Sequence, residues 1–262
     1  MHVIAVATFK GGAGKTTTSL QLAAELLSRG QRVLLVDLDT SADATVGTGL
    51  AAAKGAVPPL LLALSPDDDT TIPDVVTPSP WGFDVLPSAG SRQQMVEHLV
   101  ADDSGWTLLR DALQAASAEY DFVVVDCPAQ YGAFTRLGLT AASHALIPLE
   151  LGTKDSVRAM PRTLSMIGRV QSGDNPDLQI LGVLPCRKDR TRLARELVEL
   201  LRHHDLLGRH LLRRNEKVIT IREAAAVRNA KAQNQPVRTH SPRSPVVRDF
   251  SAVADVVMEV CL

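Results

Sequence analysis

Short apolar runs alternate along this 262-residue chain with longer stretches whose apolar positions recur at helical spacing. Continuous apolar runs are typical of strands buried on both faces of a parallel sheet, and their alternation with helices is typical of α/β folds. The pattern predicts an α/β fold with a mostly parallel, twisted sheet and helices on both faces. The expected strands are residues 3–8, 32–36, 83–86, 122–125, 144–149 and 179–184.

Two helices are indicated by their apolar spacing and by the residues at their ends. From Thr16 to Ser28 apolar side chains recur every three or four residues, and Gly30 is suited to ending that helix. The segment 241–245, Ser-Pro-Arg-Ser-Pro, marks a turn into a last helix with one apolar face. Residues 51–80 are interpreted as a surface excursion, so we expect one domain over residues 1–262.

Composition narrows the class of protein. The chain is 45% hydrophobic and 22% charged, and no apolar run reaches the roughly 18 residues that a membrane span needs. The N-terminus passes directly into the first strand, so no signal peptide is expected. The three cysteines are far apart and lack metal-ligand spacing, so we interpret them as thiols in a reducing cytoplasm.

Residues 9–17, FKGGAGKTT, have the composition of a phosphate-binding loop between a strand and a helix. The glycines allow a tight turn that points backbone N–H groups at phosphate oxygens, and the start of the helix adds its positive dipole end. Lys15 can reach the β- and γ-phosphates, and the Thr16 hydroxyl can bind Mg²⁺. The predicted nucleotide-binding residues of this loop are Lys10, Gly11, Gly12, Ala13, Gly14, Lys15, Thr16 and Thr17.

This loop departs from the usual P-loop pattern because Phe9 stands in the place of its first glycine and Lys10 adds a second lysine. The pattern Lys-Gly-Gly-x-Gly-Lys-Thr resembles the deviant Walker A motif of the ParA/MinD family of ATPases. The resemblance implies a P-loop NTPase with ATP and Mg²⁺ as cofactors, and catalytic roles for Lys10 and Lys15. It also implies that Lys10 reaches the partner's nucleotide across a dimer interface, so turnover should require dimerisation.

Carboxylates follow two further predicted strands, and the first of these strands is expected to lie next to the P-loop strand. Asp37 and Asp39 follow that first strand, and Asp126 ends the apolar run of the other, as in a Walker B strand. Ligands bind at the carboxyl ends of such strands. The resemblance assigns Thr16, Asp37 and Asp126 to the magnesium site and gives Asp39 a catalytic role, positioning the attacking water. The alternative is that these carboxylates only cap the turns that follow them.

The surroundings of these acids differ from the family pattern, which reads Asp-x-Asp-Pro-Gln-Gly-Asn-Ala-Thr. Residues 40–43 read Thr-Ser-Ala-Asp instead, and no glutamate follows Asp126 to act as a base. These features favour slow hydrolysis that depends on positioning and charge neutralisation. A nucleotide-binding scaffold that has lost hydrolysis is an alternative.

Charge is distributed unevenly along the chain. Residues 187–248 hold sixteen Lys and Arg against six acids, whereas residues 1–186 sum to −8. This asymmetry indicates a polyanion partner. With 3% aromatic residues and no base-reading motif, we expect phosphate contacts to double-stranded DNA without sequence preference; a solvated charged face is the alternative. The candidate DNA contacts are Arg187, Lys188, Arg190, Arg192, Arg195, Arg213, Lys217, Arg222 and Arg228.

The resemblance continues more loosely over residues 181–250, where Arg214 and Asn215 match a family segment that lies near the adenine base. It implies a ParA-type partitioning ATPase that is cytoplasmic and nucleoid-associated. Such a protein forms an ATP-dependent homodimer, binds DNA non-specifically and is stimulated by a ParB-like centromere-binding protein. A MinD-like membrane-associated ATPase is the alternative, but residues 250–262 contain no Lys or Arg for a basic amphipathic anchor.

Overall fold

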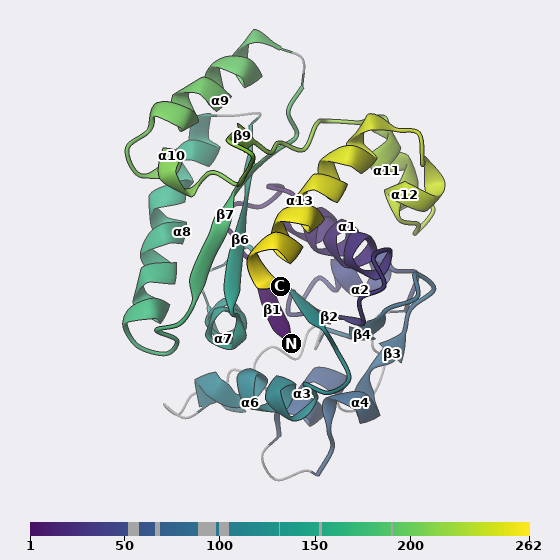
Figure 1. The fold of residues 1–262 in the computed structure, drawn as a ribbon. Helices are drawn as coiled ribbons and strands as arrows, with labels where there is room; N and C mark the ends of the chain where they lie inside the picture. Colours follow the sequence, from purple (N-terminus) through teal and green to yellow (C-terminus); the bar gives the residue numbers. More distant parts are fainter. Residues whose placement is uncertain are drawn as a thin grey trace.

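The computed structural model describes residues 1–51, 58–65, 69–88, 98–99, 105–130, 132–151, 154–189 and 191–262. Within them the centre of the fold is a seven-stranded sheet with strand order β3-β4-β2-β5-β1-β6-β7 (Figure 1). Neighbouring strands are parallel except β3 and β4, which are antiparallel. The predicted fold class is therefore confirmed. The strands are β1 (His2–Val6), β2 (Val33–Asp37), β3 (Thr77–Pro78), β4 (Asp84–Leu86), β5 (Phe122–Asp126), β6 (His144–Glu150) and β7 (Gln179–Cys186).

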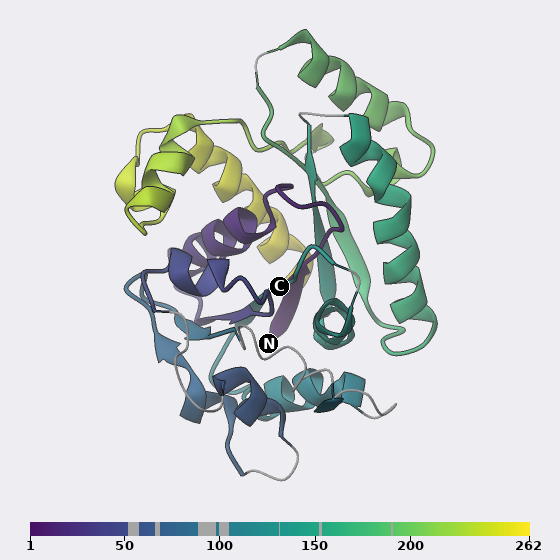
Figure 2. The same cartoon turned by 180° about the vertical axis from the view of Figure 1, so that it is seen from behind.

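Helices cover both faces of this sheet, as Figures 1 and 2 show from opposite sides. Strand side chains alternate between two cores: Val3 and Ala5 face one core, and Ile4 and Val6 face the other. The first core is covered by α3 (Pro59–Leu64), α4 (Ile72–Val75), α6 (Leu108–Ala115), α7 (Ala133–Ala141), α8 (Lys154–Ser172), α9 (Arg192–His203) and α10 (Leu207–His210). The second is covered by α1 (Lys15–Leu27), α2 (Asp43–Gly47), α11 (Ala225–Ala232), α12 (Val237–His240) and α13 (Pro245–Cys261).

Both helices that the spacing predicts are present. The helix α1 ends at Leu27, and Gly30 adopts the left-handed conformation with φ 80°. The last helix, α13, begins with Pro245 in its first turn, where the missing N–H of proline does no harm. No helix in the described part of the chain combines the length and hydrophobicity that crossing a membrane requires.

A small hairpin, β8 (Arg213–Arg214) and β9 (Lys217–Val218), lies outside the main sheet. Its turn residues, Asn215 and Glu216, both have positive φ angles, as the twist of a two-residue hairpin requires. Strands of two residues have no detectable periodicity, which explains why the hydrophobic pattern does not predict them.

The register of the central strands decides where the chemistry lies. In the β1–β5 pair Val6 is opposite Asp126, and in the β2–β5 pair Asp37 is opposite Asp126. Strand β5 lies between β2 and β1, so the expectation that the Asp37 strand is next to the P-loop strand is wrong. The three strands nevertheless end together at the carboxyl edge of the sheet. The loop that follows β1 and the acids that end β2 and β5 share that edge.

Candidate nucleotide site

The phosphate-binding loop connects β1 to α1 and requires glycine at particular points. Gly12 and Gly14 have φ angles of 76° and 94°, in the left-handed region that other residues rarely adopt. A Cβ at Gly14 would lie 3.7 Å from the Cβ of Cys186, an ordinary van der Waals contact, so the backbone angle and not crowding requires glycine there. The helix begins immediately afterwards at Lys15, so its unpaired N–H groups and its positive dipole end face the loop.

Lys15 is buried at the start of α1, and its Nζ donates a 3.4 Å hydrogen bond to the backbone oxygen of Lys10. Burial lowers the pKa of Lys15, while the negative charges of Asp126 and Asp39 oppose that shift. A phosphate placed here would add negative charge and stabilise the ammonium form. The environment therefore fits an amine that holds an anion. Lys10 is half-buried on the preceding turn.

Asp126 is fully buried at the end of β5 and accepts two hydroxyl hydrogen bonds from α1. The Thr16 Oγ1 lies 2.8 Å from its Oδ2, and the Ser19 Oγ lies 2.7 Å from its Oδ1. Burial, and then the charge of Asp37, raise the pKa of Asp126 to about 7. A hydroxyl and a carboxylate in contact beside a phosphate loop are ligands that suit Mg²⁺.

Ser19 contacts Asp126, and it is not among the site residues predicted from the sequence. It lies one helical turn after Thr16, on the same face of α1, and helical spacing could have indicated it. Its hydroxyl also donates to the Lys15 backbone oxygen at 3.1 Å. The Ser19 side chain therefore joins the start of α1 to the end of β5.

Asp37 is also fully buried, and its carboxylate organises the segment that follows β2. Its Oδ2 accepts hydrogen bonds from the Thr45 backbone N–H at 2.8 Å and the Thr45 hydroxyl at 2.7 Å. Its Oδ1 accepts one from the Asp39 N–H at 3.1 Å. Burial dominates and raises the pKa of Asp37 to about 6. Asp37 therefore caps the turn that follows β2, which is the alternative that the sequence leaves open. It also lies at the carboxyl edge of the sheet, where a metal site is expected.

Asp39 lies two residues further, where its Oδ1 accepts a 3.0 Å hydrogen bond from the Ser41 N–H. Its backbone oxygen accepts a 2.6 Å hydrogen bond from the Ser88 hydroxyl. Between these acids and α2, Ala42 has a φ angle of 55°. The matching residue of the family pattern is glycine, which adopts this left-handed conformation without the Cβ clash. The altered 40–43 segment therefore holds an alanine in a strained backbone position.

A pocket of about 210 Å³ adjoins the loop on the side of Gly12 and Gly14. Its other walls come from the end of β7, residues 221–224, α11 and Phe250 of α13, and Thr17 completes the loop side. The pocket is partly apolar and opens at the start of α1, so it suits the base and sugar of a nucleotide whose phosphates occupy the loop.

The structure does not bring Arg214 and Asn215 to this pocket. Both line a separate hollow with Lys217 and Arg248, and the Arg214 guanidinium forms ion pairs with Asp255 and Glu259 of α13. Their contact with the adenine base, which the family resemblance implies, therefore stays a prediction. The segment that does reach the pocket is residues 221–224.

Several predicted DNA contacts are engaged with acids of the same chain. Arg192 pairs with Glu196 at 2.6 Å, Arg222 with Asp249 at 2.6 Å, and Arg228 with Glu223 at 3.4 Å. Arg187, in the left-handed region with φ 57°, pairs with Glu150 at 2.8 Å and lines the nucleotide-side pocket. The sequence gives no sign of the Arg222 and Arg187 pairings, because Asp249 and Glu150 are distant along the chain. Glu196 and Glu223 lie only four and five residues from their arginines.

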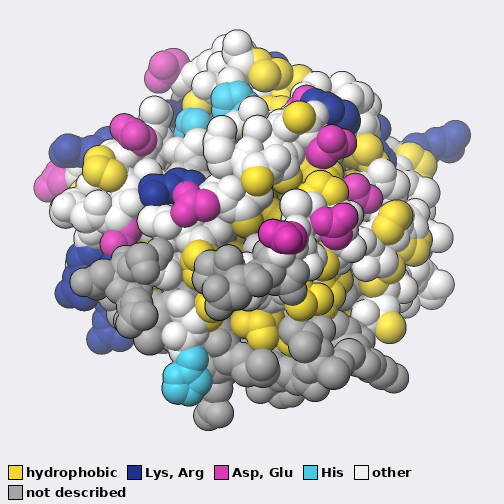
Figure 3. All heavy atoms as spheres, turned by 90° about the horizontal axis from the view of Figure 1, so that it is seen from below, with side chains coloured by type: hydrophobic (Ala, Val, Ile, Leu, Met, Phe, Trp, Pro, Cys, Tyr) yellow, Lys and Arg dark blue, Asp and Glu magenta, His cyan; other side chains and the backbone are white. Residues whose placement is uncertain are grey.

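The remaining predicted contacts differ in their exposure. Arg195 and Lys217 are exposed, Lys188 is half-buried, and Arg213 donates to the backbone oxygens of Gly208 and Glu216. Arg190 lies outside the described residues. Seen from below, several Lys and Arg side chains gather at the left edge, the side on which Figure 1 places α8, α9 and α10 (Figure 3).

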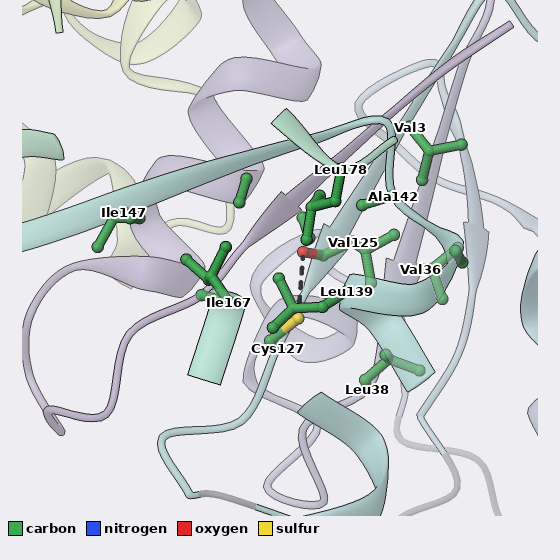
Figure 4. Close-up of a cluster of buried hydrophobic side chains, with 14 of the residues drawn as sticks. Val3, Val36, Leu38, Val125, Cys127, Leu139, Ala142, Ile147, Ile167 and Leu178 are labelled. Carbon is green, nitrogen blue, oxygen red and sulfur yellow. Dashed lines mark hydrogen bonds between the residues drawn. The ribbon is translucent and has the colours of Figure 1, made fainter. Parts of the chain in front are cut away.

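Cys127, next to Asp126, is a packing residue. It is fully buried among apolar side chains that include Leu38, Val125 and Leu139 (Figure 4). Burial raises the pKa of its thiol far above the ordinary value, which leaves no reactive thiolate. A Cβ at Gly138 would lie 2.9 Å from the Cys127 sulfur, so glycine lets α7 approach the end of β5 closely.

Comparison with known proteins adds an independent observation. The model of an AAA domain family, AAA_31, matches residues 1–180. The sporulation initiation inhibitor protein Soj of Bacillus subtilis is 31% identical over 261 residues, 98% of this chain and 97% of that protein. The chromosome-partitioning ATPase Soj of Thermus thermophilus is 34% identical over 97% of this chain and 94% of its own length. The chain belongs to the ParA/MinD family of ATPases.

The solved structures agree with this membership. Cobyrinic acid a,c-diamide synthase from Mycobacterium smegmatis, crystallised with ADP and magnesium, superposes with a TM-score of 0.81 at 28% identity, covering 99% of this chain and 94% of that one. As a member of the ParA/MinD family, the chain is an ATP hydrolase that uses ATP and Mg²⁺. The donor set of Thr16, Asp126 and Lys15 fits both, because it offers oxygen ligands and a cation at one edge of the sheet.

Proposed function

We propose that this protein is a ParA-type partitioning ATPase, organised as one P-loop domain over residues 1–262, that segregates a chromosome or plasmid. The observation that carries the proposal is the junction of a two-lysine P-loop with a buried Walker B carboxylate, held by the Thr16 and Ser19 hydroxyls. The chromosome-partitioning ATPase Soj of Thermus thermophilus, which matches nearly the whole chain, supports the partitioning role.

Each residue of the loop has a part in binding. Backbone N–H groups of residues 11–17 surround the phosphates, and the Lys15 ammonium neutralises charge on the β- and γ-phosphates. The Thr16 hydroxyl and Asp126 hold Mg²⁺, with Asp126 acting through a water, and Asp37 supports that side of the site. Bound Mg²⁺ supplies charge neutralisation between the β- and γ-phosphates.

Hydrolysis depends on positioning because no glutamate base follows Asp126. Asp39 orients the attacking water from the edge of the site, where its half-buried carboxylate also accepts the Ser41 N–H. Lys10 crosses to the nucleotide of a second copy and stabilises the negative charge that develops there, in the manner of an arginine finger. Turnover therefore requires the ATP-bound dimer.

The ATP-bound dimer binds double-stranded DNA without sequence preference, through phosphate contacts from the basic segment 187–248. Arg195 and Lys217, which are exposed, are the strongest single candidates within that segment. A ParB-like centromere-binding partner stimulates hydrolysis and releases the DNA. The protein then acts in the cytoplasm, associated with the nucleoid and without a membrane partner.

Light scattering on the Asp39→Ala variant tests the dimer directly. With saturating Mg-ATP we expect twice the monomer mass of 28.1 kDa, and with ADP the monomer mass, because hydrolysis is blocked while binding is kept. Adding Lys10→Ala to that variant should restore the monomer. A mass that stays monomeric with Mg-ATP in the Asp39→Ala variant would refute the proposal.

A further inference from the structure

A second hollow lies beside the P-loop, on a side that shares no lining residue with the nucleotide-side pocket. This hollow, the α8 groove, has a volume of about 560 Å³. Its walls include Phe9, which precedes Lys10, and Ala129, which follows the Walker B strand. Pro161, Arg162, Met166 and Arg169 of α8 complete it. The groove therefore touches both loops that flank the nucleotide site.

The face of α8 that lines the groove is basic. Arg162 and Arg169 are exposed, seven residues apart, and so lie on one helix face with Ser165 between them. In the described part of the chain neither arginine forms an ion pair. The helix contains a single acid, Asp155 in its first turn, whose side chain is outside the described residues. In Figure 2 the loop between β1 and α1 bends toward α8, in agreement with the shared lining of the groove.

The floor of the groove is apolar. Phe9 and Pro161 are partly exposed within it, and the side chain of Met166 packs beneath them into the core. Two cations on either side of an apolar floor match a ligand that carries two anionic groups and an apolar group between them. Duplex DNA matches less well, because a phosphate backbone has no apolar group to bury against Phe9 and Met166.

The spacing of the cations defines the ligand further. Seven residues of α-helix correspond to an axial distance of ~10.5 Å, which separates Arg162 from Arg169. A second helix with acids at positions i and i+7 has the same separation, and its i+3 and i+4 side chains point at the floor between them.

We propose that the α8 groove is a docking site for an acidic amphipathic helix of a partner protein. Glutamates or aspartates two turns apart on that helix pair with Arg162 and Arg169, and the apolar residues between them pack on Phe9, Pro161 and Met166. A helix bound there contacts the loops after β1 and β5 at the same time.

The test uses the full-length protein and a fluorescein-labelled, alanine-based helical peptide of about 21 residues. The peptide carries two Glu residues seven positions apart with two Leu residues midway between them. We expect saturable binding by fluorescence anisotropy at low ionic strength. Binding should weaken about tenfold in Arg162→Glu with Arg169→Glu, and about tenfold when the Leu residues of the peptide become Gln.

The matched control is Arg243→Glu with Arg248→Glu, which changes the charge equally at two exposed arginines before and on α13; it should stay within about twofold. Retained ATP binding shows that each variant is folded, and Arg162→Gln with Arg169→Gln repeats the test without charge reversal. Binding that is equal in all variants overturns the proposal. The proposal is also overturned if the Glu/Leu peptide fails to bind and the Arg162/Arg169 variant loses duplex DNA binding or Mg-ATP dimerisation. The groove then serves DNA or a second copy of this protein.

Discussion

Asp37 and Asp126 are register partners at the carboxyl ends of the adjacent parallel strands β2 and β5, and both carboxylates are fully buried. Each is held by hydroxyl donors, Asp37 by Thr45 and Asp126 by Thr16 and Ser19. Two buried acids in neighbouring positions concentrate negative charge at one edge of the sheet. That charge attracts a divalent cation and opposes folding when no cation is bound.

This pairing predicts how the free energy of unfolding depends on pH when the protein is free of nucleotide and metal. The folded-state pKa values of Asp37 and Asp126, about 6 and about 7, lie above the ordinary value of 3.8. The folded state therefore binds more protons than the unfolded state in that window, and stability falls as pH rises from 4 towards 7. Thermal unfolding in EDTA should show a higher Tm at pH ~5.5 than at pH ~7.5. The double variant Asp37→Asn with Asp126→Asn should lose most of that slope; a slope of the opposite sign in the wild type would contradict the assignment.

Asp126→Asn should separate metal binding from nucleotide binding. Asparagine keeps the size of the side chain and can still accept from Thr16, but it removes the charge that holds Mg²⁺. We expect ATP binding to persist while its enhancement by Mg²⁺ falls at least about tenfold, equivalent to ~1.4 kcal/mol. Calorimetric titrations with and without Mg²⁺ measure this, and an unchanged Mg²⁺ effect would remove Asp126 from the metal site.

Lys15→Ala should abolish the binding of ATP. The substitution removes a buried cation from the loop, and a charge-assisted contact to phosphate is among the strongest polar interactions. The dissociation constant should rise more than about a hundredfold, or ~2.7 kcal/mol. Fluorescent-nucleotide binding measures it, with Lys217→Ala, an exposed hairpin lysine, as the control. Retention of wild-type affinity in Lys15→Ala would show that the loop is not the phosphate site.

Ala42→Gly should stabilise the protein. Ala42 has φ 55°, and the left-handed conformation costs a residue with a Cβ about 1–2 kcal/mol. Glycine removes that cost but adds flexibility to the unfolded chain, so the net gain should be about 0.5–1 kcal/mol. Urea denaturation measures it. The same change at Ala112, inside α6, should instead destabilise by about 1 kcal/mol.

Arg195→Glu should weaken binding to duplex DNA of every sequence alike. Each lost phosphate contact lowers the slope of log affinity against log salt by about 0.9. Electrophoretic shifts with random duplexes in Mg-ATP, over a range of salt, measure both effects. Arg110→Glu on α6 changes charge equally at an exposed arginine outside the basic segment and should leave the slope unchanged. If the two variants bind alike, the phosphate contacts lie elsewhere.

The buried strands and the two-sided packing were predictable from the sequence because burial on both faces leaves continuous apolar runs such as Val123–Val125. The strand order was not, since the structure places β5 between β2 and β1. The phosphate loop was predictable for a related reason. Gly12, Gly14, Lys15 and Thr16 are adjacent in the chain, so their spacing alone defines the turn, the cation and the hydroxyl. Local chemistry of this kind does not depend on distant contacts.

The tertiary structure alone decided which distant side chains meet. In the structure Arg222 pairs with Asp249. Arg214 pairs with Asp255 and Glu259 and does not line the nucleotide-side pocket. Phe9 lines the same groove as Arg162 and Arg169. The sequence does not show whether a charged side chain faces solvent or an acid from another element. Its partner is fixed only when strands and helices pack, because ion pairing acts over a few ångströms of space and not along the chain.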